Sequence, residues 1–175
     1  MAALKPGACY GAIAYNQRVF ARILARSMIQ GRPLLSAACA VGALLLGALL
    51  LYEGSRPGTR VPLAGGIAHV DKAMHFSAHL LLTSMLLWAG LLWPRGRAAF
   101  RLRLAAVGAF ALDCAFGAGA ELVQYAWGQR FGRQAEWGDA LANLAGTAVA
   151  TLVFLMVVRW ALRAYINRRR AGSKP

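Results

Sequence analysis

The segment LLSAACAVGALLLGALLLY, residues Leu34–Tyr52, decides the fold class, because its nineteen residues include no charged side chain. A helix needs about 20 predominantly apolar residues to cross the hydrocarbon core of a membrane. The rest of the 175-residue chain has the same character, with 59% hydrophobic residues and a mean hydropathy of +0.49. A soluble domain of this length would carry more charge and shorter apolar runs. The sequence therefore predicts an integral membrane protein.

Three further apolar segments follow the first one. They run over about Lys72–Trp93, Leu104–Tyr125 and Asp139–Trp160. Backbone amides in lipid must find partners within a helix or a closed barrel, and the sequence lacks the alternating segments of a barrel. We therefore expect an all-α integral membrane protein with four transmembrane helices. The first segment is longer than the apolar core of a signal sequence and no A-x-A site follows it, so we expect an uncleaved anchor.

Lysine and arginine are distributed unevenly around these segments. Fifteen of the 20 basic residues lie in the N-terminal segment, in the connection 93–103 and in the tail from residue 159. The loops 53–71 and 126–138, together with Lys72, hold the other five. Positive charge is retained on the cytoplasmic side of a membrane. We therefore predict a bacterial cytoplasmic (inner) membrane protein with both termini in the cytoplasm and these two loops outside.

The four-helix membrane domain is predicted to cover residues 34–160, between a basic segment (1–33) and a basic tail (161–175). Within the first of these, arginines recur every four residues from Arg18 to Arg26, which predicts an amphipathic helix over 10–30 on the inner membrane surface. A flexible basic leader is the alternative. The formal net charge of +14 could indicate nucleic-acid binding. We predict no nucleic-acid partner, because the basic residues flank apolar segments and form no separate domain.

Polar side chains gather where the second, third and fourth segments meet the outer surface. Each segment carries them at helical spacing, so that they form a stripe on one face. The three stripes are Lys72, His75 and His79; Asp113, Gly117, Glu121 and Gln124; and Asp139, Asn143 and Thr147. Ionisable groups that face lipid are costly, so the stripes should turn toward one another. We predict an outward-facing pocket, with loop arginines above it, lined by Lys72, His75, Glu121, Gln124, Asp139 and Asn143.

The same side chains also have simpler explanations. Pairs such as Lys–Glu or Asn–backbone can hold helices together without binding a ligand. Asp113 is expected to stand apart from the cluster, either protonated and packed or paired with a basic residue near the cytoplasmic end. His79 is either a hydrogen-bonded core residue or an extra site ligand. A metal could in principle be held by His75, His79, Glu121 and Asp139. Their spacing in the sequence matches no known metal-binding motif, so we predict no metal and no cofactor.

Three motifs in this order resemble the VanZ-like family of small bacterial membrane proteins. DKAMHF (Asp71–Phe76) is similar to the family's D-K-x-x-H-F, and ELVQY carries its E-x-x-Q on Glu121 and Gln124. RQAEWGDALANLAG (Arg133–Gly146) is similar to its pattern of Arg, Asp, Asn and Gly. The resemblance covers about residues 71–150. It implies a location in the cell envelope and a link to resistance against the glycopeptide teicoplanin, and it implies no reaction.

The family often has one arginine between the Glu-Gln pair and the aspartate, whereas this chain has two. Arg130 and Arg133 therefore compete for that role, and the spacing to Asp139 favours Arg133.

The first functional hypothesis is a pocket that binds an envelope component: a lipid-linked intermediate, a phospholipid headgroup or a glycopeptide antibiotic. Arg133 and Lys72 would hold an anionic group. The full set of expected binding residues is Lys72, His75, Glu121, Gln124, Arg133, Asp139 and Asn143. The alternative is an intramembrane enzyme acting on a lipid phosphate or ester, with His75 as base or nucleophile beside Glu121 or Asp139. A pure scaffold is a third reading, and the sequence leaves the oligomeric state open.

Overall fold

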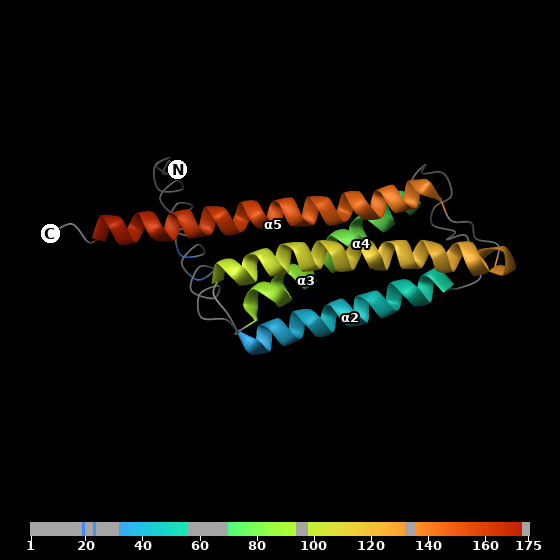
Figure 1. The fold of residues 1–175 in the computed structure, drawn as a ribbon, viewed down its shortest axis with the longest axis horizontal. Coiled ribbons are helices and arrows are strands. Elements are labelled where there is room, and N and C mark those ends of the chain that lie inside the picture. Colours follow the sequence, from blue (N-terminus) through green and yellow to red (C-terminus); the bar gives the residue numbers. More distant parts are fainter. Residues whose placement is uncertain are drawn as a thin grey trace, which may run out of the picture.

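The structure, a computed structural model, describes residues 19, 23, 32–55, 70–93, 98–131 and 136–172 of the chain. It contains four long helices within these residues: α2 (Pro33–Ser55), α3 (Val70–Leu92), α4 (Ala98–Phe131) and α5 (Trp137–Gly172). They lie side by side along one long axis (Figure 1). The amphipathic helix predicted over 10–30 falls outside the described residues except for Val19 and Ile23.

All four helices are long and apolar enough to cross a membrane. The candidate spans are Pro33–Tyr52, Val70–Leu92, Phe100–Ala126 and Trp137–Asn167. This confirms the predicted all-α fold with four candidate spans, and it supports a multi-pass membrane protein. Large apolar side chains such as Leu34, Leu44 and Val107 are exposed on the bundle surface, as lipid-facing residues must be.

The last two helices extend beyond the apolar segments that predicted them. α5 has 36 residues, which corresponds to about 54 Å of helix, whereas the hydrocarbon core is about 30 Å thick. It continues as far as Gly172, because the residues after Trp160 are mostly good helix formers such as alanine, leucine and arginine. Much of the basic tail is therefore a straight extension of the last helix.

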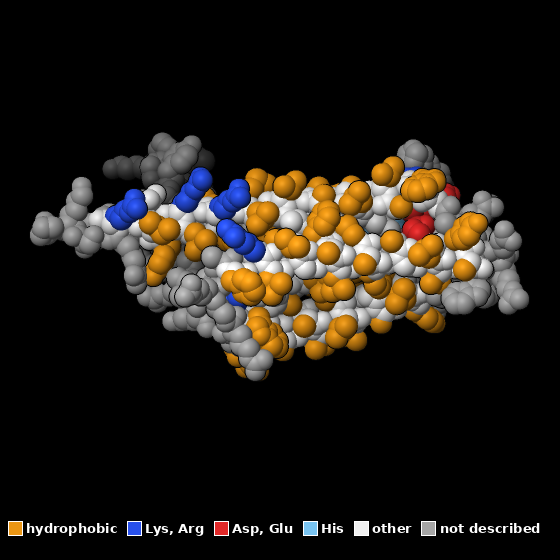
Figure 2. Space-filling view, in the orientation of Figure 1, with side chains coloured by type: hydrophobic (Ala, Val, Ile, Leu, Met, Phe, Trp, Pro, Cys, Tyr) orange, Lys and Arg blue, Asp and Glu red, His pale blue; other side chains and the backbone are white. Residues whose placement is uncertain are grey.

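The two ends of the bundle differ in the charged side chains that the structure describes. α2 and α4 begin, and α3 and α5 end, at what we call the basic end, where Lys and Arg side chains gather along α5 (Figure 2). α3 and α5 begin at the other end, which we call the acidic end because it carries Asp71, Glu136 and Asp139. Figure 2 shows acidic side chains at this end on the visible face.

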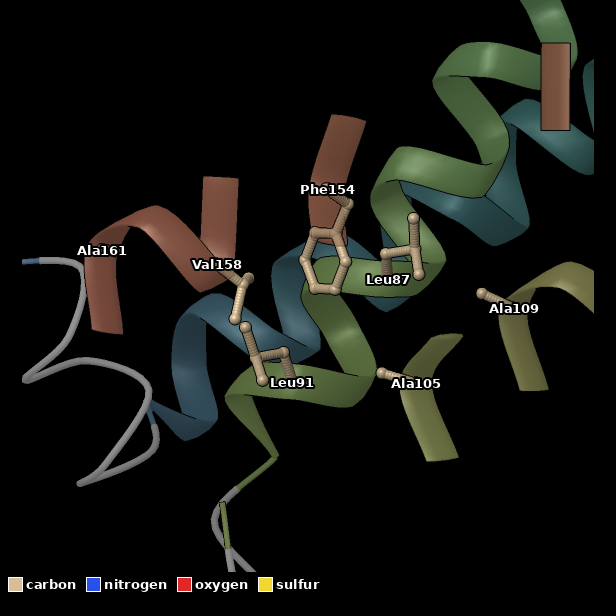
Figure 3. Packing of buried hydrophobic residues seen from close by; sticks show 7 residues of the cluster. All are labelled: Leu87, Leu91, Ala105, Ala109, Phe154, Val158 and Ala161. Atoms are coloured by element: carbon tan, nitrogen blue, oxygen red, sulfur yellow. The ribbon is translucent and has the colours of Figure 1, made fainter. Parts of the chain in front are cut away.

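Helix α3 is the centre of the bundle, because its contacts with α5, α2 and α4 are the three most extensive between helices. A core of seven buried side chains joins α3, α4 and α5 (Figure 3), and it consists of Leu87, Leu91, Ala105, Ala109, Phe154, Val158 and Ala161. Three of these are alanines, which allow helix backbones to approach closely in lipid. Trp88 packs edge-on against Phe154, with ring centroids 5.2 Å apart. α2 is attached through Ser36, whose hydroxyl donates to Ala89 O at 2.7 Å.

The closest helix contact is formed by Gly146 of α5. A Cβ atom at this position would collide with the Phe76 carbonyl oxygen of α3 and would lie 3.0 Å from Leu80 N. Both obstacles are backbone atoms, which cannot move aside as a side chain can. α3 and α5 therefore lie this close only because residue 146 has no side chain.

We predict that Gly146→Ala destabilises the protein. The added methyl group forces α3 and α5 apart, and overpacking of this kind costs about 1–3 kcal/mol. The measurement is the thermal unfolding midpoint of the purified protein in detergent, followed by tryptophan fluorescence. Gly108→Ala is the matched control, because a Cβ atom there meets nothing within 4 Å. Equal midpoints for the two variants would contradict the proposed close contact.

Candidate functional site

Lys72 is the centre of an ion-pair network at the acidic end. Its Nζ lies 2.9 Å from Glu136 Oε2 and 3.0 Å from Asp139 Oδ1. Asp139 belongs to the first turn of α5, where a negative charge is stabilised by the helix dipole, and its side chain is only 6% exposed. Gly138 gives the lysine room, because a Cβ atom there would lie 2.6 Å from Lys72 Cε. The network fastens the start of α3 to the start of α5.

His75 lies one turn further into the bundle. Its Nδ1 is 3.0 Å from Asn143 Oδ1. Since an amide oxygen only accepts hydrogen bonds, Nδ1 donates to it, and in a neutral imidazole Nε2 then presents a lone pair. Nε2 faces two carboxylates, 3.8 Å from Asp139 Oδ2 and 3.9 Å from Asp71 Oδ1. The predicted meeting of Lys72, His75, Asp139 and Asn143 is therefore present in the structure.

Glu121 of α4 adds a buried carboxylate to the cluster. Neither of its oxygens forms a well-aligned hydrogen bond among the described residues, although the backbone N–H of Glu136 interacts with this carboxylate. Asp139 and His75 lie within electrostatic range of it. Gln124, one turn further along α4, is partly buried. Glu121 is thus close to the cluster predicted for it, and among the described residues it forms no ion pair like the one between Lys72 and Asp139.

The arginines of the prediction cannot be placed in this site. Arg133 lies outside the described residues, and for Arg130 only the backbone within α4 is described. The described side chains of the site carry four carboxylates, on Asp71, Glu121, Glu136 and Asp139, against the single ammonium of Lys72. With all carboxylates ionised and His75 neutral, this part of the site carries a net negative charge of about three.

Asp113 was expected to lie apart from the outer cluster, either protonated and packed or paired with a basic residue near the cytoplasmic end. The structure places it in a second, inner cluster, as a packed side chain. Its side chain is fully buried, and Oδ2 accepts hydrogen bonds from the hydroxyls of Thr83 and, at 2.7 Å, Thr147. His79 Nδ1 lies 3.0 Å from Asp113 Oδ1, although this contact is not aligned as a hydrogen bond. The polar stripes of α3 and α5 simply continue one more turn inward than the predicted pocket, and Asp113 meets them there. His79, left open between core residue and ligand, is a buried core residue here, paired with that carboxyl.

Asn143 connects the outer cluster with this inner one. Its side chain bonds His75, and its backbone carbonyl oxygen lies 3.0 Å from the Thr147 hydroxyl. That hydroxyl has one proton, so it donates either to Asn143 O or to Asp113 Oδ2 at a given moment. Gly117 lets α4 approach both clusters, because a Cβ atom there would lie 3.0 Å from His79 Cε1. Polar contacts thus extend from the acidic end into the middle of the bundle.

Comparison with known proteins returned no relative on which to base a function. No family model, no curated protein and no solved structure matches the chain. The chemistry of the site therefore rests on the residues described above.

We predict that Thr83→Val lowers stability, because it removes a hydrogen bond from a buried carboxyl group without changing the shape of the side chain. Leaving such a group short of a donor costs about 1–3 kcal/mol. The measurement is again the thermal midpoint in detergent. Thr151→Val is the matched control: Thr151 donates only to the Thr147 carbonyl oxygen within its own helix, at 2.9 Å. A control variant as unstable as Thr83→Val would show that the Asp113 contact is not the cause.

Proposed function

We propose that the chain is a multi-pass protein of the bacterial cytoplasmic membrane, with both termini in the cytoplasm and the acidic end facing outward. The charge difference between the two ends supports this orientation, since positive residues remain inside. A cleft of about 530 Å³ at the basic end is lined in part by Arg159, Trp160 and Arg163. Arginine and tryptophan together are typical of the headgroup region of a membrane.

The function proposed for the outer site is to bind the polar group of a cell-envelope component. The observation that carries this proposal is Glu121. Ion pairs that only join helices satisfy one another, as Lys72, Glu136 and Asp139 do. The buried Glu121 carboxyl interacts with the backbone N–H of Glu136 but forms no well-aligned hydrogen bond among the described residues, and buried groups of this kind are often completed by a water, an ion or a ligand. Its position beside His75 and Asp139 makes this cluster the place where a ligand would be recognised.

The resemblance to the VanZ-like family narrows the class of ligand. The motifs that carry it contain the outer-site residues Lys72, His75, Glu121, Asp139 and Asn143. The ligands in keeping with this resemblance are a lipid-linked intermediate, a phospholipid headgroup and a glycopeptide antibiotic. Arg133 would supply the positive charge that an anionic group requires.

A second function, an intramembrane enzyme acting on a lipid phosphate or ester, is favoured by the geometry of His75. Asn143 holds the imidazole with its Nε2 lone pair toward Asp139, 3.8 Å away. A histidine fixed in one tautomer beside a carboxylate is suited to act as a general base. In this reading Glu121 would be the proton acceptor or the electrostatic partner of the reaction.

The proposed orientation predicts which loops react from outside the cell. In a chain whose native cysteines Cys9, Cys39 and Cys114 are replaced by alanine, Thr59→Cys should react with a membrane-impermeant maleimide in intact cells. Ser173→Cys should react only after permeabilisation, because it lies on the cytoplasmic side. Labelling of residue 173 in intact cells would reverse the proposed orientation.

The proposed binding function predicts a co-purifying ligand. Native mass spectrometry of the gently solubilised protein should show a bound lipid or lipid-linked sugar that is lost at least tenfold in Arg133→Ala and in His75→Ala. Arg103→Ala is the control, since this exposed arginine lies at the basic end and does not line the cleft described there. If the protein is an enzyme, the mass of a lipid incubated with the wild-type protein should change, and it should stay unchanged with His75→Ala. A wild-type protein without any bound component, and with no effect on lipids, would overturn both functions.

A further inference from the structure

Three side chains at the acidic end bring metal-binding atoms together. Asp71, His75 and Asp139 each offer one ligand atom, and these atoms all lie within 4.8 Å of one another. Asp71 and His75 are four residues apart on α3, so they share one helix face, and Asp139 reaches them from α5. Zn²⁺ binds nitrogen and carboxylate oxygen at about 2.0–2.2 Å, which places tetrahedral ligand atoms about 3.4 Å apart. His75 Nε2 lies 3.8 Å from Asp139 Oδ2 and 3.9 Å from Asp71 Oδ1. These two distances are about half an ångström longer than those between the ligand atoms of a tetrahedral Zn²⁺ site.

The surrounding contacts orient these atoms as they do in metal sites. A ligating histidine donates its other ring N–H to an oxygen, which fixes the tautomer and the ring orientation. Asn143 Oδ1 fills that role for Nδ1 of His75, at 3.0 Å. Lys72 bonds Asp139 through Oδ1, at 3.0 Å, and this leaves Oδ2 facing His75. Both ligands are thus held in place by a second layer of contacts.

Asp71 supplies the adjustable member of the set. Its side chain is 62% exposed in the first turn of α3, so it can rotate by the small distance that coordination requires. Asp139, by contrast, is almost fully buried and is held by Lys72. The site therefore combines two fixed ligands with one that can close.

Charge and burial point to a cation as well. The described side chains of the outer site hold four carboxylates, on Asp71, Glu121, Glu136 and Asp139, and one ammonium, on Lys72. The Glu121 carboxyl, buried and without a well-aligned hydrogen bond among the described residues, lies within electrostatic range of Asp71, His75 and Asp139. A divalent cation among these groups would offset most of the excess charge and would give Glu121 an opposite charge to face.

We infer that Asp71, His75 and Asp139 bind a divalent transition-metal ion, with Glu121 as a nearby carboxylate that faces its charge. One imidazole with two or three carboxylates is a donor set suited to Zn²⁺. The inference uses the residues of the proposed function but does not depend on it, because a metal can bind whether or not an envelope component does.

The test is a titration of the full-length protein in detergent, after chelator treatment, with Zn²⁺ alone by isothermal titration calorimetry. We expect one saturable site per chain, weakened at least tenfold in His75→Gln and in Asp71→Asn. Glu136→Gln is the matched control. The Glu136 side chain is 60% exposed, close to the 62% of Asp71, and it bonds Lys72. It offers no ligand atom to the three-residue site. The affinity of this variant should stay within about twofold of the wild type.

Three results would overturn the inference: no saturable binding, binding that survives His75→Gln, or a loss in Glu136→Gln as large as that in Asp71→Asn. The last would mean that the acidic end attracts cations only by its general charge. If the protein binds Zn²⁺ but carries no envelope component, the metal site is supported and the proposed function is not. If it carries an envelope component but does not bind Zn²⁺, the proposed function is supported and the metal site is not.

Discussion

The close contact of α3 with α5 at Gly146 is the constraint on which the polar interior depends. It places the Phe76 carbonyl and Leu80 N against a residue without a side chain, so the two helix axes lie nearer than ordinary side chains permit. At that distance short polar side chains on the two helices can reach the same atoms. The contacts of Lys72 with Asp139 and of His75 with Asn143 lie on the outer side of this point. The hydroxyls of Thr83 and Thr147 meet Asp113 on its inner side.

Much of the fold was predictable, because a membrane imposes simple rules on a sequence. Uncharged length identifies spans, and lipid forces their backbone into helices. The same reasoning placed Lys72, His75, Asp139 and Asn143 together, since stripes at helical spacing on neighbouring spans must avoid lipid. What the rules do not give is how far inward a stripe continues. Thr83 escaped notice because threonine is tolerated on any face of a membrane helix, where its hydroxyl can bond its own backbone.

Asp113 and Asp71 show two further limits of the sequence. Asp113 lies on the same stripe as Glu121, but its partners come from two other helices whose rotation is fixed only by packing. Asp71 had a signal that could have been used, its spacing of four residues from His75. An aspartate in the first turn of a helix also stabilises the helix dipole, so this spacing has an ordinary explanation as well. The arginines, central to the predicted anion site, lie where side chains are not described, so their part in the site stays a prediction.

The deepest polar contacts of the bundle join helices that are synthesised one after the other. The deepest carboxyl, Asp113, finds Thr83 and His79 on α3, the helix synthesised just before its own, about 30 residues earlier in the chain. The contacts of Lys72 with Asp139 and of His75 with Asn143 join residues 67 and 68 positions apart, and they lie toward the end of the bundle, where Lys72 and Glu136 remain in part exposed. During membrane insertion, the α3–α4 hairpin can therefore shelter its buried carboxyl group before α5 exists. The groups that must wait longest for their partners are those nearest to the water that can solvate them in the meantime.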